Sequence, residues 1–205
     1  MKELRTTGVA VAAVALLAAC TAGTNAANPT TSTTSANSAV TSTSTVSATS
    51  TTTSPEDNAA AHAEEVLRAY YRAQTSCFAD PTQVPLTCFD QLAITTELMN
   101  MRNALGGAKQ MRTKVSGDIA LLSVRPKSVN VTNNPSATPP VVPEVVFRVC
   151  TDVSSYNIVD KDGKSIVPAD RKPHVLVDVS VLNYKYPDPA EWRVGLVTPV
   201  KDESC

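Results

Sequence analysis

A long uncharged stretch rich in serine and threonine limits where this 205-residue chain can build a core. From Thr21 to Ser54, 21 of the residues are Ser or Thr, and none is charged or aromatic. Such a composition buries too little apolar surface to offset the entropy lost on ordering. We therefore expect residues 20–54 to form a disordered linker, either O-glycosylated or an unmodified spacer. Residues 55–205 are then left to fold as one domain.

The start of the chain has the features of an export signal. Lys2 and Arg5 precede an apolar run at 8–19, which is too short to cross a bilayer as a helix. The run ends in Leu17–Cys20 (Leu-Ala-Ala-Cys), which resembles the lipobox of bacterial lipoproteins. The resemblance implies a signal peptide over residues 1–19 and a diacylglycerol on Cys20. The chain would then be anchored to the cell membrane on its extracytoplasmic side. A plain secretory signal cleaved elsewhere and an uncleaved anchor are the alternatives.

Charge and motifs narrow the classes of function. Without its first 19 residues the chain has 16 basic and 18 acidic residues, a net charge near −2, which argues against a nucleic-acid partner. The sequence contains no phosphate-binding loop, dinucleotide fingerprint, serine-hydrolase elbow or His-Glu-x-x-His motif. We expect no cofactor and no catalysis. An acid/base enzyme remains an alternative, because such sites leave no local signature.

Four cysteines remain besides the lipobox cysteine, and an even number in an exported domain predicts two disulfides. Of the three possible pairings we favour Cys77–Cys88, which brackets a proline-containing turn between two helices, together with Cys150–Cys205. The second bond would attach the C-terminal residue to a central strand. A metal site is disfavoured because the cysteines form no Cys-x-x-Cys pair and only His62 and His174 could complete it.

Two helices are expected at the start of the domain. Ser54–Asp57 provides an N-cap serine, a proline and two acidic residues, which predicts a helix from Pro55 to about Ser76. A second helical pattern covers Leu86 to about Ala104, either continuous or broken near Ile94–Thr96. The pair Gly106-Gly107 is expected to end it.

The pattern then changes to strands. The expected strands are Val115–Val131 (one bent strand, or two separated at Arg125-Pro126), Glu144–Thr151, Tyr156–Val159, Lys164–Val167, His174–Tyr184 and Glu191–Val200. Asn133–Pro143 is a proline-rich loop, and Asp160–Gly163 is expected to close a small hairpin. Helices followed by hairpin-linked strands predict an α+β fold with an antiparallel sheet.

This order of elements carries a second resemblance. It consists of two helices around a cysteine-bracketed turn, then a sheet that contains Val149–Asp152, the hairpin Tyr156–Val167, and Glu191–Val194 before a terminal cysteine. This arrangement resembles small exported actinobacterial lipoproteins. Those proteins resemble the NTF2-like (cystatin-like) fold, in which a curved sheet wraps a long helix to form a cone. The fold implies little about activity, because NTF2-like domains include enzymes, ligand carriers and interaction modules. Mycobacteriophages carry similar lipoproteins, so a phage or prophage superinfection-exclusion lipoprotein is an alternative.

The candidate binding residues are those that such a cone could display. Tyr70 and Tyr71 are expected to divide between the core and the mouth of the cone. Asp178 could face the cone, and His174 begins a strand. Asp152 could also face the cone, although a turn-capping role suits its position better.

Other candidates have simple structural interpretations. Asp160-x-Asp162-Gly163 lacks the twelfth-position glutamate of a calcium loop and suits a tight turn. Trp192 is expected in the core. Six basic residues could dock an anionic partner or form a solvated face: Arg102, Lys109, Arg112, Lys114, Arg125 and Lys127.

We therefore expect a membrane-anchored, non-enzymatic lipoprotein whose C-terminal domain binds a protein or a small ligand. Its partners would be the membrane, through the lipid anchor, and an envelope protein or a small apolar ligand.

Overall fold

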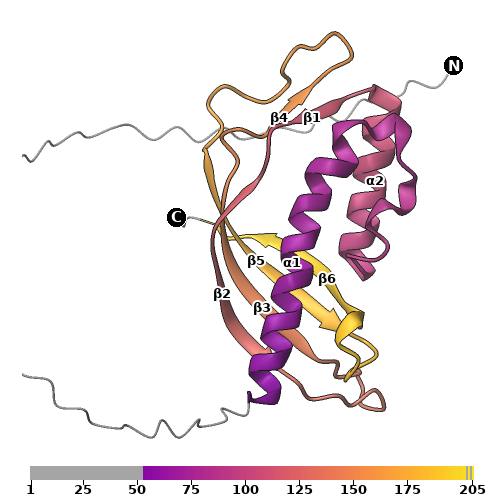
Figure 1. The fold of residues 1–205 in the computed structure, drawn as a ribbon, viewed down its shortest axis with the longest axis vertical. Helices are drawn as coiled ribbons and strands as arrows, with labels where there is room; N and C mark the ends of the chain where they lie inside the picture. Colours follow the sequence, from indigo (N-terminus) through magenta and orange to yellow (C-terminus); the bar gives the residue numbers. More distant parts are fainter. Residues whose placement is uncertain (1–52, 202, 204) are drawn as a thin grey trace, which may run out of the picture. The chain divides into compact units, whose positions relative to one another are not determined.

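A computed structural model describes residues 53–201, 203 and 205 (Figure 1). The predicted signal peptide, Cys20 and the linker up to residue 52 lie outside the described residues. In chain order the elements are α1 (Pro55–Ala79), two 3₁₀ turns (Pro81–Gln83 and Leu86–Phe89), α2 (Thr95–Met111), β1 (Lys114–Ser116), β2 (Ala120–Asn130), β3 (Glu144–Asp152), β4 (Asn157–Val159), β5 (His174–Asn183), a third 3₁₀ turn (Pro189–Glu191) and β6 (Trp192–Pro199). The predicted α+β class is confirmed. None of the helices described is long and apolar enough to span a bilayer.

Helix α1 begins as its capping signature predicts. The Ser54 hydroxyl accepts a hydrogen bond from the backbone N–H of Asp57 at 3.0 Å, and Pro55 occupies the first helical position. The helix continues to Ala79, three residues beyond the expected end. Its buried face, which includes Leu67, packs against the sheet.

The second helical segment, expected over Leu86–Ala104 as either continuous or broken near Ile94–Thr96, is divided. After the 3₁₀ turn, the chain runs along the edge of β6, where Ile94 N–H donates to the Val194 carbonyl and Val194 N–H donates to the Leu92 carbonyl, both at 2.9 Å. These bonds pair the exposed edge of the sheet. Helix α2 starts only afterwards, so the predicted break near Ile94–Thr96 is confirmed.

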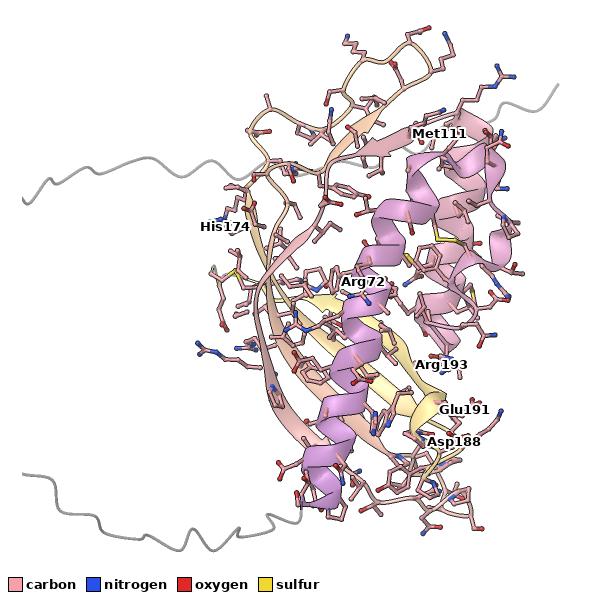
Figure 2. The ribbon with its side chains drawn as sticks, viewed as in Figure 1. Arg72, Met111, His174, Asp188, Glu191 and Arg193 are labelled. Carbon is pink, nitrogen blue, oxygen red and sulfur yellow. A yellow bond between two sulfur atoms is a disulfide. The ribbon has the colours of Figure 1, made fainter. Side chains whose placement is uncertain are left out.

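The expectation that Gly106-Gly107 ends the second helix is wrong. Helix α2 continues through both glycines to Met111 (Figure 2). It ends at Arg112, whose backbone is left-handed with φ 54°. Glycine weakens a helix interior by only about 1 kcal/mol, which tertiary packing of Leu105 and Ala108 can offset.

The larger sheet has the strand order β2-β3-β5-β6, with every pair antiparallel. Strand β2 runs through Arg125-Pro126 as one strand, with a register shift between Pro126 and Ser128. Proline lacks a backbone donor, and an edge strand with a bulge is where a sheet tolerates it. The expected strand segment Val115–Val131 is therefore divided, but at residues 117–119 between β1 and β2 and not at Arg125-Pro126, so neither form of that prediction is correct.

The smaller sheet consists of β1 and β4, with Val115 opposite Ile158. The expected strand over Lys164–Val167 is absent from this part of the described chain, where only Ser165 bridges to Val159. The turn itself is as predicted, because Gly163 N–H donates to the Asp160 carbonyl at 3.0 Å. The returning segment still hydrogen-bonds to β4, because Ile166 N–H donates to the Ile158 carbonyl at 2.9 Å, but the pairing is too short to count as a strand.

The core lies between α1 and the inner face of the larger sheet. Alternate residues of the central strands point to α1, among them Phe147 on β3 and Val179 on β5, both fully buried. Trp192 is 1% exposed, so its predicted core position is confirmed.

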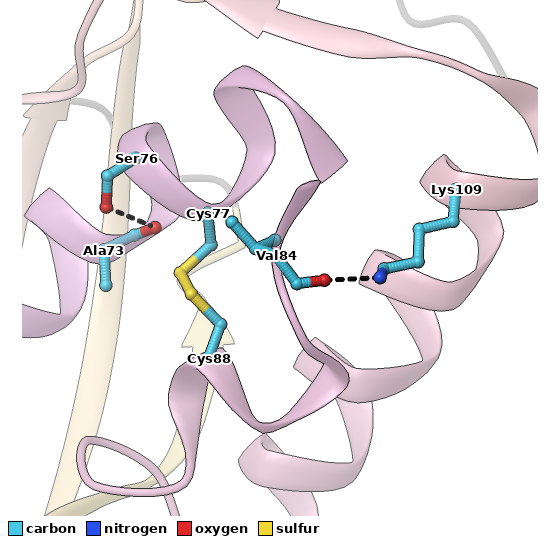
Figure 3. The surroundings of a disulfide bond; sticks show 6 residues. All are labelled: Ala73, Ser76, Cys77, Val84, Cys88 and Lys109. Atoms are coloured by element: carbon cyan, nitrogen blue, oxygen red, sulfur yellow. Dashed lines mark hydrogen bonds between the residues drawn. A yellow bond between two sulfur atoms is a disulfide. The ribbon is translucent and has the colours of Figure 1, made fainter. Parts of the chain in front are cut away.

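Both predicted disulfides are present. Cys77 and Cys88 have Cα atoms 6.3 Å apart, and the bond ties the end of α1 to the 3₁₀ turn Leu86–Phe89 (Figure 3). Nearby, the Lys109 ammonium donates to the Val84 carbonyl, which connects the same loop to α2. Cys150 and Cys205, with Cα atoms 5.9 Å apart, attach the C-terminal residue to β3.

Candidate functional site

The predicted binding residues do not converge on one site. Tyr70 and Tyr71 are both buried, 1% and 6% exposed, so the expected division between core and cone mouth is wrong. Their rings pack edge to face, with centroids 5.6 Å apart. His174 is exposed at the start of β5 (Figure 2), opposite Asp152 in the register.

Asp178 lies on the outer face of the larger sheet, on the side opposite the buried Val177 and Val179. Its carboxylate accepts two hydrogen bonds from Arg148, at 3.0 and 3.2 Å, and one from Lys127 at 2.7 Å. These bonds, with that from Arg148 the strongest cause, lower the pKa of Asp178. The residue belongs to an outer ion cluster and does not face α1.

A buried polar contact that sequence analysis missed joins the two helices. The Tyr70 hydroxyl on α1 donates to the carboxylate of Glu97 on α2, and the Asn100 amide donates to the same carboxylate at 3.4 Å. Burial, followed by the nearby Glu97 charge, raises the pKa of both Tyr70 and Tyr71 well above 10.0. Tyr70 therefore acts as a neutral donor. Glu97 is 3% exposed, so this contact holds the helices together away from solvent.

An apolar pocket lies one helical turn beyond this contact. It has a volume of about 380 Å³ and is formed by the C-terminal halves of α1 and α2, the small sheet and the loop after β4. Its lining residues are Gln74, Phe78, Met101, Ala104, Ala108, Met111, Thr113, Lys114, Val115, Tyr156, Ile158 and Ile166. We call this hollow the apolar pocket.

The mouth of the apolar pocket exposes large apolar side chains. Met111 is 63% exposed and Ile166 is 52% exposed, although both line the pocket. Methionine adapts its shape to different ligands, which suits a binding surface. The polar groups are few, and Tyr156 is one of them, with its pKa raised by burial. This arrangement can bind an apolar group and offers a small number of hydrogen bonds.

The six basic residues do not form one patch. Arg102 pairs with Asp90 at 2.6 Å and Lys114 pairs with Asp80 at 2.9 Å, near the helices. Lys127 belongs to the outer ion cluster, on the larger sheet. The single basic surface considered from the sequence is therefore absent from the described residues.

The remaining acidic candidates have local structural roles. Asp152 accepts the Ser154 N–H at 2.8 Å, which is the predicted turn-capping role. Asp160 accepts the N–H groups of Asp162 and Lys164, both at 2.9 Å, as a tight turn requires. Across the described ranges, no group of three or more His, Cys, Asp or Glu side chains is arranged to hold a metal ion.

No known family model matches the sequence, and no curated protein does either. Solved structures do match, among them the crystal structure of the intermembrane space region of chloroplast protein ARC6. It is 12% identical, with a TM-score of 0.47, and the match covers 69% of this chain and 95% of that chain. A likeness this distant gives no information about function, which must be inferred from the geometry of the site.

Proposed function

We propose that this chain is an exported lipoprotein, held at the membrane through Cys20, whose folded domain binds a small, mainly apolar ligand in the apolar pocket. The observation that carries the binding proposal is the pocket itself. Its volume of about 380 Å³ falls within the range of roughly 300–1,000 Å³ that is common for small-molecule sites. Its walls are mostly apolar, with a few polar groups such as Gln74 and Thr113.

We further propose that the domain is of the NTF2-like type. A long helix, α1, lies along the inner face of an antiparallel sheet whose strands bend around it (Figure 1). The apolar pocket opens at the end of this arrangement where α1 meets β1 and β4. A site of that kind in such a fold supports a ligand carrier, which is one of the roles that NTF2-like domains have.

Native mass spectrometry of the full chain, recovered from an exporting bacterial host, tests the binding proposal. We expect an added mass that denaturation releases. Ala104→Trp should remove it, because Ala104 lies in the pocket wall with an exposed side chain and an indole there would fill the pocket. Asn103→Trp is the matched control, since Asn103 is exposed on the same helix outside the lining. An added mass that Ala104→Trp retains would contradict the proposal.

The anchor is tested separately with radiolabelled palmitate. Wild-type chain should incorporate the label and remain with the membrane fraction, whereas Cys20→Ala should incorporate none. Label in both chains, or in neither, would refute lipidation at Cys20 and would leave the ligand-binding proposal unaffected.

A further inference from the structure

A second hollow adjoins the apolar pocket and is bordered by positive charge. It has a volume of about 360 Å³ and shares Thr113 and Lys114 with the apolar pocket, so the two meet where α2 passes into β1. We call it the cationic hollow. Its lining residues are Thr82, Arg112, Thr113, Lys114, Val159, Asp160, Lys161 and Gly163. Three of these side chains are cationic and one is acidic.

The two lysines of the cationic hollow are held only loosely. Lys114 contacts Asp80 at 2.9 Å and Lys161 contacts Asp162 at 2.7 Å, and all four side chains are substantially exposed. Exposed ion pairs are weak because water screens them, so both ammonium groups are able to turn toward another anion. The carboxylate of Asp160 is directed to the backbone N–H groups of its own turn instead.

Arg112 has an unusual backbone for its residue type. It ends α2 with φ 54°, in the left-handed region where a helix normally places glycine. Among the described residues its guanidinium forms no ion pair. Sequences depart from such a local preference most often at functional positions. Glycine would suit this backbone better but would carry no charge, so the guanidinium of Arg112 at the border of the cationic hollow points to a functional role.

We infer that the ligand is an amphiphile with an anionic head group, its hydrocarbon chain in the apolar pocket and its head at Arg112, Lys114 and Lys161. This inference rests on the proposed function, because it needs the apolar pocket to bind. A carboxylate and a phosphate share the required chemistry, and Arg and Lys serve as donors to both. A free fatty acid and a phosphate-headed lipid are therefore the two sources to distinguish.

The test measures equilibrium binding of radiolabelled dodecanoate, dodecyl phosphate and dodecanol to the full chain in phosphatidylcholine nanodiscs. The binding that remains in Ala104→Trp, whose pocket is filled, is subtracted as background. Partitioning of the ligands into the bilayer is the same for every variant, so it cancels when a variant is compared with wild type. Arg112→Gln combined with Lys161→Gln should weaken binding of the anions about tenfold or more and leave dodecanol within twofold. The matched control is Lys164→Gln, which removes one charge from the same turn outside the lining. It should leave all three ligands unchanged.

Each outcome has a defined meaning. Tighter binding of dodecyl phosphate than of dodecanoate supports a phosphate-headed lipid, and the reverse order supports a fatty acid. Two outcomes would overturn the inference that the ligand has an anionic head group: dodecanol binds as tightly as both anions, or the double variant keeps the preference for anions. Neither outcome contradicts the proposal that the pocket binds an apolar ligand. No binding of any of the three also overturns the inference of an anionic head group, and the native mass spectrum then decides the proposed function independently.

Discussion

A Cβ atom on Gly117 would lie 1.9 Å from the carbonyl oxygen of Ser155, so the turn after β1 and the loop before β4 meet backbone to backbone. The Ser155 hydroxyl reinforces the contact by donating to the Asp118 carbonyl at 2.9 Å. Both segments lead into the small sheet, which forms one wall of the apolar pocket. This close approach therefore fixes the position of the pocket wall.

Gly117→Ala should destabilise the domain by about 3 kcal/mol or more, because it combines a backbone clash with a left-handed φ of 74°. Gly163→Ala is the control, with a similar φ of 79° and no atom within 4 Å of the added Cβ. It should cost only about 1 kcal/mol. Urea unfolding of both variants measures the difference, and equal losses would mean that the contact with Ser155 is not tight.

Tyr70→Phe should lower the free energy of unfolding by about 1–3 kcal/mol, since it leaves the buried Glu97 carboxylate without its hydroxyl donor. Tyr71→Phe removes a hydroxyl for which no hydrogen bond is found within the described residues, and it should cost less than about 1 kcal/mol. Chemical denaturation at neutral pH gives both values. Similar losses in the two variants would rule out a special role for the Tyr70–Glu97 contact.

Stability should fall as the pH rises above about 10. Burial raises the pKa of Tyr70 and Tyr71 in the folded state above the ordinary value of 10.0. In that alkaline range the unfolded chain loses phenol protons that the folded chain keeps, so proton loss favours unfolding. The urea midpoint followed against pH should decline, and less steeply in Tyr70→Phe. A wild-type midpoint that stays constant to pH 11 would contradict the buried, neutral phenols.

Arg112→Gly should stabilise the domain by roughly 0.5–1 kcal/mol, because glycine relieves the left-handed backbone at a small entropic cost. Thermal unfolding should show a higher midpoint. Arg112→Gln retains the strained backbone, so it should lose anion binding without any gain in stability. If glycine gives no gain, the backbone at Arg112 is not strained, and that argument for a functional arginine is lost.

Local patterns predicted the elements better than the site. The N-cap of α1, both disulfides and the core position of Trp192 follow from signals within a few residues or from cysteine parity. Strand alternation also places Asp178 on the opposite face of β5 from Val177 and Val179. Because the two valines fill the core inside the cone, Asp178 has to face outward, and the expectation that it faces the cone was inconsistent with this pattern. The end of α2 was misplaced because tertiary packing carries the helix past its glycines.

The apolar pocket could not be predicted, because its walls come from α1, α2, β1, β4 and a loop that no local pattern brings together. Glu97 did leave a signal. It occupies a position on α2 in helical register with the buried Leu105 and Ala108, where an apolar residue is usual. An acidic residue in such a stripe indicates a buried polar partner on the facing helix.

The methyl resonances of the methionines test the binding site most directly. Met101 and Met111 line the apolar pocket, whereas Met99, two residues earlier than Met101 on the same helix, is 63% exposed outside it. Dodecanoate titrated into methyl-labelled chain should shift the Met101 and Met111 signals with one shared saturation curve and leave Met99 in place. Saturable binding that moves Met99, or that moves neither Met101 nor Met111, would show that the ligand binds elsewhere and would contradict the account.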